Sequence, residues 1–197
     1  MNNNLDLNSG QQGSEVETSV TAALRLSERQ RFQQRLARAT SQASDWNGVL
    51  EVVAKILSEA SGSQLVVVVR SGSTPAEATI DGLTAPLDKG SDELRQRLAL
   101  FALSACRSAS TQVQGLQGNH GNSVVSVPLM QSEAHFEALQ LLHDFADAGH
   151  RDRVVSLVEL TGSALREWRS NSVSRSLQSR LDVTTALVDL LLSLIHI

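Results

Sequence analysis

The sequence predicts an α+β fold, and three observations lead to this prediction. In the stretch Gly121–Leu142, two apolar runs, Val124–Met130 and Ala138–Leu142, are separated by seven mostly polar residues. Two strands at this separation most simply pair as an antiparallel hairpin. An apolar and β-branched run, Leu65–Val69, predicts a strand that is buried on both faces. Helical patterns of apolar residues, of which Arg151–Trp168 is the strongest, occupy both ends of the chain.

The N-terminal part divides into a polar tail and a helix. Residues 1–21 are rich in Asn, Gln, Ser and Gly, so we expect a disordered tail that can bury too little surface to fold. Residues 22–44 predict an amphipathic helix with one basic face. Such a face can lie on an anionic membrane, but we favour a solvated face because the apolar face lacks bulky residues. The apolar face consists of Leu24, Phe32, Leu36, Ala39 and Ala43, and the basic face of Arg29, Arg31, Arg35 and Arg38.

Residues 45–170 are the predicted domain, which begins with a second helix. Ser44 and Asp45 offer an N-cap, and the glycine within Ser61–Ser63 offers a C-terminal stop. A weaker strand, Ala76–Ile80, follows the strand Leu65–Val69 at a distance that favours a hairpin. The apolar stripe of the second helix consists of Trp46, Leu50, Val53 and Leu57.

A third helix is predicted over Asp92–Arg107, followed by a strand over Thr111–Leu116. The buried stripe of this helix consists of Leu94, Leu98, Phe101, Ala102 and Ala105. Cys106 lies close to the stripe, and we interpret it as a core residue, since a functional thiol needs a nearby histidine or cation to lower its pKa. The strand alternates glutamine with apolar residues, which is typical of a sheet edge. The glycine-rich turn Gly115–Gly121 leads into a strand rather than a helix, so it predicts a mobile hairpin tip and not a phosphate loop.

Few polar side chains are spaced for metal binding or catalysis. The candidates around the last strand are His135, His143, His150, Asp144, Asp147 and Asp152. The histidine spacing fits no metal motif, and a solvated acidic loop is commoner than a carboxylate pair that performs acid–base chemistry. No nucleophile motif or phosphate loop is recognisable. We therefore expect no metal site, no catalytic residues and no enzymatic activity.

The C-terminal pattern indicates one long helix or two. A first stripe consists of Val154, Leu157, Val158, Thr161, Leu165 and Trp168, and a second of Leu177, Leu181, Thr184, Leu187, Val188 and Leu191. Residues 171–192 are either a C-terminal helix or the start of a following region, and their apolar seam needs a partner. That partner is either the first helices or a second copy of the chain. Residues 193–197 resemble a translated sequencing adaptor, so we expect them to be an artefact and assign them no function.

Composition excludes several classes of protein. Of 197 residues, 17 are Lys or Arg and 21 are Asp or Glu, and the net charge of −4 argues against a non-specific nucleic-acid binder. Aromatic residues make up only 3%, too few for a platform on which bases stack. The single cysteine excludes an internal disulfide and is compatible with a cytoplasmic location. The apolar run Ala186–Ile197 is too short to span a bilayer, so any membrane segment would have to lie in sequence further downstream.

The predicted order of elements resembles that of a GAF domain, a relative of the PAS sensor fold. The likeness covers Trp46–Trp168 and rests on Leu65–Val69, on Val127-Pro128-Leu129 and on the strand Phe136–Leu142 that runs into the last helix. It implies an antiparallel sheet of five or six strands, with the N- and C-terminal helices packed on one face and a pocket on the other. The family's Asn-Lys-Phe-Asp-Glu signature does not occur in the sequence. Its Cys-His pair is also missing, because Arg107 follows Cys106. The usual glycine after the fourth strand is also replaced, so any cofactor or ligand stays unassigned.

Two functional hypotheses follow. In the first, a regulatory module binds a small molecule or a partner in a pocket lined by Val68, Arg70, Ile80 and the helical segment Asp88–Leu98, and signals through Arg151–Leu192. In the second, the chain is a ligand-free dimerisation domain at the cytoplasmic N-terminus of a larger protein, as in membrane-fusion adaptors of secretion systems. Both hypotheses include a homodimer through the terminal helices. Converging polar groups in the pocket would favour a sensor, and a packed core of Val, Leu and Ala would favour a scaffold.

Overall fold

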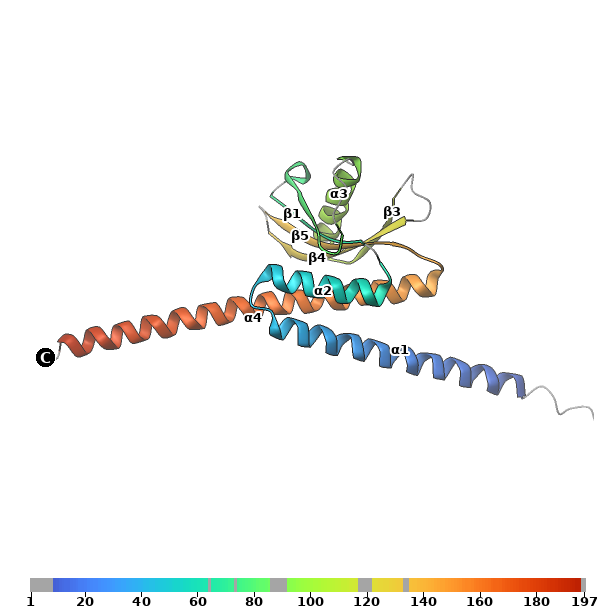
Figure 1. The fold of residues 1–197 in the computed structure, drawn as a ribbon, viewed down its shortest axis with the longest axis horizontal. Coiled ribbons are helices and arrows are strands. Elements are labelled where there is room, and N and C mark those ends of the chain that lie inside the picture. Colours follow the sequence, from blue (N-terminus) through green and yellow to red (C-terminus); the bar gives the residue numbers. More distant parts are fainter. Residues whose placement is uncertain are drawn as a thin grey trace, which may run out of the picture.

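The computed structural model describes residues 9–63, 65–72, 74–85, 92–116, 122–132 and 135–195, with only the backbone described for residues 9–24 and 189–195. It contains helices and strands in the order that the sequence predicts (Figure 1). The helices are α1 (Ser9–Gln42), α2 (Trp46–Ser61), α3 (Asp92–Ser108) and α4 (Ala148–Ile195), with a short 3-10 helix, η1 (Pro75–Glu77). The strands are β1 (Leu65–Ser71), β2 (Thr79–Gly82), β3 (Gln112–Gly115), β4 (Asn122–Gln131) and β5 (Phe136–Asp144).

The five strands form one antiparallel sheet in the order β2-β1-β5-β4-β3. The predicted central hairpin is β4–β5, in which Val124 faces Leu142 and Val127 faces Leu139. Its register is interrupted between Pro128 and Met130, where proline, which has no N–H to donate, is tolerated. The β-branched run is β1, which lies between β2 and β5, and β3 forms a sheet edge as expected.

Helices cover both faces of the sheet. Helices α2 and α4 pack on one face with α1 outside them, and α3 packs on the other face (Figure 1). Alternation along β1 divides its side chains between the two layers: Val66 and Val68 join the core under α2 and α4, whereas Val67 and Val69 join the core under α3. The structure therefore confirms the predicted α+β class, with terminal helices on one face.

The stripe predicted for the first part of α4 is buried. On α4, the six residues from Val154 to Trp168 that were expected to face the core are each at most 8% exposed. Helix α2 begins at Asp45, whose Oδ1 accepts a hydrogen bond of 2.8 Å from the amide of Gly48. It ends at Gly62, which adopts a left-handed conformation with φ of 72°.

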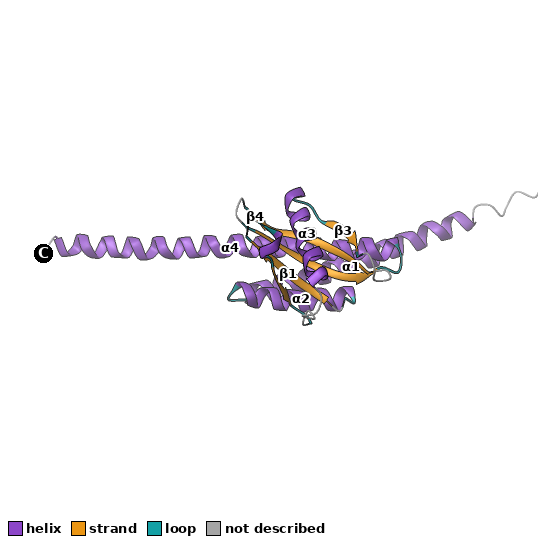
Figure 2. Cartoon of the chain, turned by 90° about the horizontal axis from the view of Figure 1, so that it is seen from above, coloured by secondary structure: helices purple, strands orange, loops and turns teal. Residues whose placement is uncertain are grey.

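Helices α1 and α4 extend beyond the sheet. They run in the same direction, but α1 projects at its N-terminal end and α4 at its C-terminal end, so the two projections lie at opposite sides of the domain (Figures 1 and 2). The segment expected as one helix or two is a single helix, α4. Among the described residues, no helix combines the length and apolar character that a membrane crossing requires.

Two predicted boundaries are wrong. Residues 9–21, expected to be a disordered tail, lie in α1, which starts before the predicted helix at residues 22–44. Extending a helix that is already anchored adds one backbone hydrogen bond per residue, which offsets weak burial. The predicted strand Ala76–Ile80 is instead η1 followed by β2, because Pro75 has a fixed φ that favours a turn at this point. Residues 88–91, expected at the start of the helix that lines the pocket, and residues 117–121 of the glycine-rich turn lie outside the described residues.

Candidate functional site

The pocket expected from the sequence is not formed by the residues that were assigned to it. Val68 is fully buried in the core under α2 and α4, and Arg70 lies on the same face of β1. Ile80 packs on the opposite face, against the core under α3. The prediction failed because strand side chains alternate between faces, so residues of paired strands share a face only when the register allows it.

The sheet face under α3 is filled by apolar side chains. Its buried core consists of Val67, Val69, Leu98, Ala102, Cys106, Leu116, Val124, Phe136 and Ala138. The buried polar side chains here include Gln140, whose Nε2 donates to the carbonyl of Leu98 and to Ser126 Oγ, each at 2.9 Å. Among the described residues, this face is therefore a packed core and not an open binding pocket.

An ionic cluster around Glu137 lies on the other face of the sheet. The Glu137 residue is 2% exposed, although it is charged. Its Oε1 accepts hydrogen bonds from Arg70 Nε at 2.9 Å and from Trp46 Nε1 at 3.0 Å. Its Oε2 is paired with Arg169. A buried carboxylate is tolerated only when it is satisfied in this way.

The partners of Glu137 are themselves held in place. The guanidinium of Arg169 stacks on the ring of Trp46 at 3.9 Å, a cation–π contact, and the rings of Trp46 and Trp168 are 5.7 Å apart. Arg70 also pairs with Asp81 on β2, at 2.7 Å. We call Trp46, Arg70, Asp81, Glu137 and Arg169 the Glu137 cluster, which joins α2, β1, β2, β5 and α4.

The Glu137 cluster lies where α4 leaves the domain. Trp168 is the last buried residue of α4, and the described side chains from Val173 to Val188 are all exposed. The cluster therefore connects the sheet to the root of the projecting half of α4. Charge-assisted hydrogen bonds therefore join the sheet to this helix in addition to the apolar packing.

An open polar groove of about 730 Å³ adjoins the cluster, with Arg70 and Asp81 in its wall. Lysine, arginine and acidic side chains alternate around it, so no single sign of charge prevails. The lining residues include Asn47, Glu51, Lys55, Glu59 and Thr84. A mixed lining of this kind favours no particular class of ligand.

The projecting half of α4 carries an exposed apolar seam. Its residues follow one another at spacings of four, four, three and four, which keeps them on one side of the helix. They are Val173, Leu177, Leu181, Thr184 and Val188, which we call the outer seam, and the four apolar members are 48–61% exposed. Leu177 follows the buried Trp168 by nine residues, which is about two and a half turns, and the half turn places it on the opposite side of α4. The outer seam therefore faces away from the sheet.

Two of the candidate histidines meet, although they lie seven residues apart. The Nε2 atoms of His143, at the end of β5, and His150, in the first turn of α4, are 3.3 Å apart. Burial and the neighbouring His150 lower the pKa of His143. Asp147 caps α4 by accepting the amide of His150 at 2.7 Å. His135 is elsewhere, and no group of three or more potential metal ligands occurs among the described side chains.

Cys106 is a core residue, as the sequence predicts. It is fully buried, and its Sγ lies 3.5 Å from the backbone oxygen of Glu137. Burial raises the pKa of the Cys106 thiol to about 11. A thiol that stays protonated at neutral pH is a poor nucleophile.

Sequence reasoning missed Glu137, Trp46 and Arg169 as members of one site. Trp46 and Glu137 are 91 positions apart in the sequence, and Glu137 and Arg169 are 32 positions apart, so no local pattern reveals their contacts. One signal was present: Glu137 interrupts the apolar strand Phe136–Leu142 at a position that must be buried if the strand is central. A charge at such a position requires a partner of opposite charge.

Comparison with known proteins gives the fold. No protein-family model matches the sequence, and no curated protein matches it at a significant level. It is similar to the nlh2 GAF domain of A. aeolicus in an inactive state, with a TM-score of 0.56 and 11% identity over 74% of this chain and 98% of that one. It is also similar to an N-acylhomoserine lactone-dependent LuxR-family transcription factor of Burkholderia cenocepacia, with a TM-score of 0.54 and 13% identity over 73% and 97% of the two chains. The chain therefore has the GAF-like fold that its sequence predicts.

Proposed function

We propose that this chain is a non-catalytic regulatory module that works as a dimer and transmits its state through α4. The observation that carries the proposal is the outer seam, an apolar helix face that extends beyond the domain with no covering element among the described residues. Exposed apolar faces of this kind are typical of interaction surfaces. The similarity to GAF domains supports a regulatory role, and we place the module in the cytoplasm, where its single thiol would stay reduced.

A second copy of the chain is the partner that we propose for the outer seam. Helix α1 of the same chain leaves the domain on the opposite side, so its described part does not cover the seam (Figure 1). Parallel pairing of two α4 helices would bury both seams at once, since each seam is complementary to itself across a two-fold axis. The Glu137 cluster would then link the sheet of each protomer to the paired helices.

The second candidate function is a ligand-free scaffold. The packed core of Val, Leu and Ala under α3 favours it, because this face offers little room for a ligand among the described residues. The two functions differ in their response to small molecules. A metabolite and cyclic-nucleotide panel monitored by thermal shift separates them, since selective binding to the folded state raises the melting temperature only in a sensor.

The oligomeric state of two matched variants tests the dimer. We expect the full chain to be a dimer by light scattering and Leu177→Glu/Leu181→Glu to be a monomer, because four carboxylates would meet in the paired seam. Ser179→Glu/Ala186→Glu adds the same charge on the opposite side of the exposed helix and should stay dimeric. A monomeric wild type, or equal behaviour of the two variants, would refute pairing through the outer seam.

A further inference from the structure

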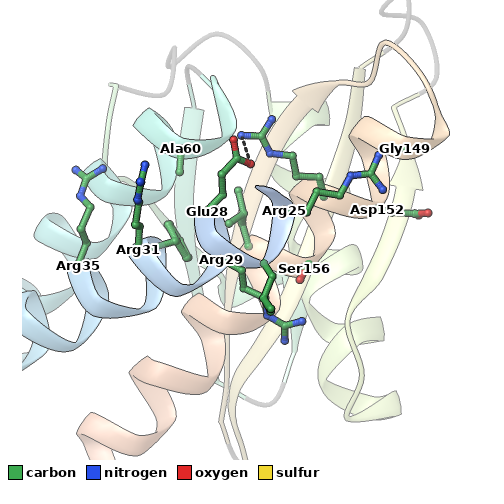
Figure 3. Close-up of a pocket in the computed structure, with 13 residues that line it drawn as sticks. Arg25, Glu28, Arg29, Arg31, Arg35, Ala60, Gly149, Asp152 and Ser156 are labelled. Atoms are coloured by element: carbon green, nitrogen blue, oxygen red, sulfur yellow. Dashed lines mark ion pairs between the residues drawn. The ribbon is translucent and has the colours of Figure 1, made fainter. Parts of the chain in front are cut away.

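A pocket of about 540 Å³ lies in the helical layer, outside the sheet and the Glu137 cluster (Figure 3). Helix α1 forms one wall, the first two turns of α4 form another, and Ala60 closes the pocket from α2. Figure 3 shows Arg25 and Arg29 on the side of α1 that faces Gly149 and Ser156 of α4. Pockets of this volume accommodate small organic ligands.

The pocket concentrates positive charge in an acidic protein. Its lining contains five arginines and two carboxylates, a local charge of +3 in a chain whose net charge is −4. The arginines are Arg25, Arg29, Arg31, Arg35 and Arg153, and the carboxylates are Glu28 and Asp152. The sequence pattern identified part of this face as basic but gave no reason to expect a concave surface there.

Some of this charge is already compensated. Glu28 pairs with Arg153 at 3.3 Å, the dashed contact in Figure 3, and Arg35 pairs with Glu59 at 2.6 Å. Arg25 and Arg29 have no ion-pair partner among the described side chains. They stand one helical turn apart on the same side of α1, about 5–6 Å between their Cβ atoms. In Figure 3 their guanidinium groups point apart, but both side chains are exposed and long enough to turn onto two oxygens of one phosphoryl or diphosphoryl group.

The remainder of the lining is apolar. Phe32 and Leu157 are buried at the pocket's base, and Leu26 is 58% exposed at its rim. Phe32 and Leu157 are already shielded, but an inorganic anion would leave the side chain of Leu26 in contact with water. A ligand that carries an apolar body beside its anionic group would cover it, at about 25 cal/mol per Å² removed from water.

We propose that the pocket binds an organic phosphate, with its phosphoryl oxygens on Arg25 and Arg29 and its apolar body against Leu26, Phe32 and Leu157. Phosphate fits better than a single carboxylate because it carries up to two charges and three acceptor oxygens, enough to pair with both arginines at once. The bound molecule would bridge α1 and α4. This site is independent of the proposed dimer, since it lies at the opposite end of α4 from the outer seam.

Binding to the full chain is tested by titration calorimetry with three probes: ADP, inorganic pyrophosphate, and phosphatidylcholine vesicles with and without phosphatidic acid. ADP represents a free organic phosphate and the vesicles a lipid headgroup. Arg25→Gln/Arg29→Gln should weaken binding about tenfold or more, and rising salt should weaken it further. Both side chains are exposed, so the variant should fold. Arg38→Gln/Arg180→Gln removes the same charge from exposed positions outside the pocket and should change binding less than about twofold.

The outcomes separate the ligand classes. The site is supported if a probe binds to the wild type and to Arg38→Gln/Arg180→Gln but not to Arg25→Gln/Arg29→Gln. Binding of ADP would then indicate a free organic phosphate, and binding of phosphatidic acid vesicles would indicate a lipid headgroup. Leu26→Ser should weaken ADP binding several-fold and leave pyrophosphate unchanged. The proposal is overturned if no probe binds, if both arginine variants lose affinity equally, or if pyrophosphate binds as tightly as ADP.

Discussion

Glu137 is held in a low-dielectric position by a balanced set of charges. Its carboxylate and that of Asp81 face the guanidinium groups of Arg70 and Arg169, so the four charges sum to zero. The side chain of Glu137 is 3% exposed, whereas those of the two arginines are 31% and 27% exposed. The arginines therefore retain part of their hydration while the carboxylate depends on them. Removing either arginine would leave this buried carboxylate with less compensation, which costs more than the pair contributes as a whole.

Substitution of Glu137 should be destabilising. Glu137→Gln keeps the shape of the side chain but removes the charge that the two arginines face, and because these arginines are about a third exposed we expect a loss of about 1–3 kcal/mol in the free energy of unfolding. Urea denaturation measures it. The control is Glu59→Gln, which breaks the Arg35–Glu59 pair on the surface and should cost less than about 1 kcal/mol. Similar small losses in both variants would mean that the cluster is hydrated and not buried.

At the scale of elements, one glycine allows α4 to approach the sheet. A Cβ added at Gly162 would lie 2.6 Å and 3.0 Å from the two Cγ atoms of Val127 on β4. Real Cβ atoms do not approach other heavy atoms to 2.6 Å, so either the helix or the strand would have to move. Glycine in the middle of a helix costs up to about 1 kcal/mol relative to alanine, and close packing offsets that cost here.

We expect Gly162→Ala to lower stability by about 1–3 kcal/mol, because overpacking outweighs the gain in helix propensity. Gly48→Ala is the matched control, since the added Cβ would meet Asp45 at an ordinary 3.5 Å, and it should be neutral or slightly stabilising. Combining Gly162→Ala with Val127→Ala removes the two clashing methyl groups and should recover part of the loss. Thermal unfolding of the four variants, including Val127→Ala alone, measures the coupling. Additive effects would show that the two residues are not in contact.

The elements were predictable from the sequence where periodicity determined them. The stripe Val154–Trp168 has helical spacing and the run Leu65–Val69 is uniformly apolar, so local pattern and final burial agree. β2 was misplaced because it is short and mostly exposed, which leaves little pattern to recognise. The Glu137 cluster was not predictable, because it depends on the sheet register that brings Arg70 opposite Glu137. The first pocket hypothesis failed for the same reason: it placed Val68 and Ile80 on one face without knowing the register.

At the scale of the whole molecule, two long helices extend from a small domain in opposite directions (Figure 2). The half of α4 beyond residue 172 contributes no buried side chain to the domain among the residues described. This half continues a helix that is anchored on the domain, so its backbone can stay helical, but its exposed apolar seam stays in contact with water. The architecture therefore separates a domain that folds around its own core from a helix whose seam we propose to be covered by a second copy.

This separation predicts how stability depends on protein concentration. The melting temperature of the full chain should rise by a few degrees for each tenfold increase in concentration, since dimer formation stabilises the folded state by mass action. A chain that ends at Asn171 should show no such dependence, and at low concentration its melting temperature should approach that of the full chain. Leu177→Glu/Leu181→Glu in the full chain should behave like the shortened chain, which separates loss of pairing from loss of the helix itself. A melting temperature of the full chain that is independent of concentration would contradict pairing. A large loss of stability in the shortened chain at low concentration would instead mean that the projecting half of α4 packs on its own domain.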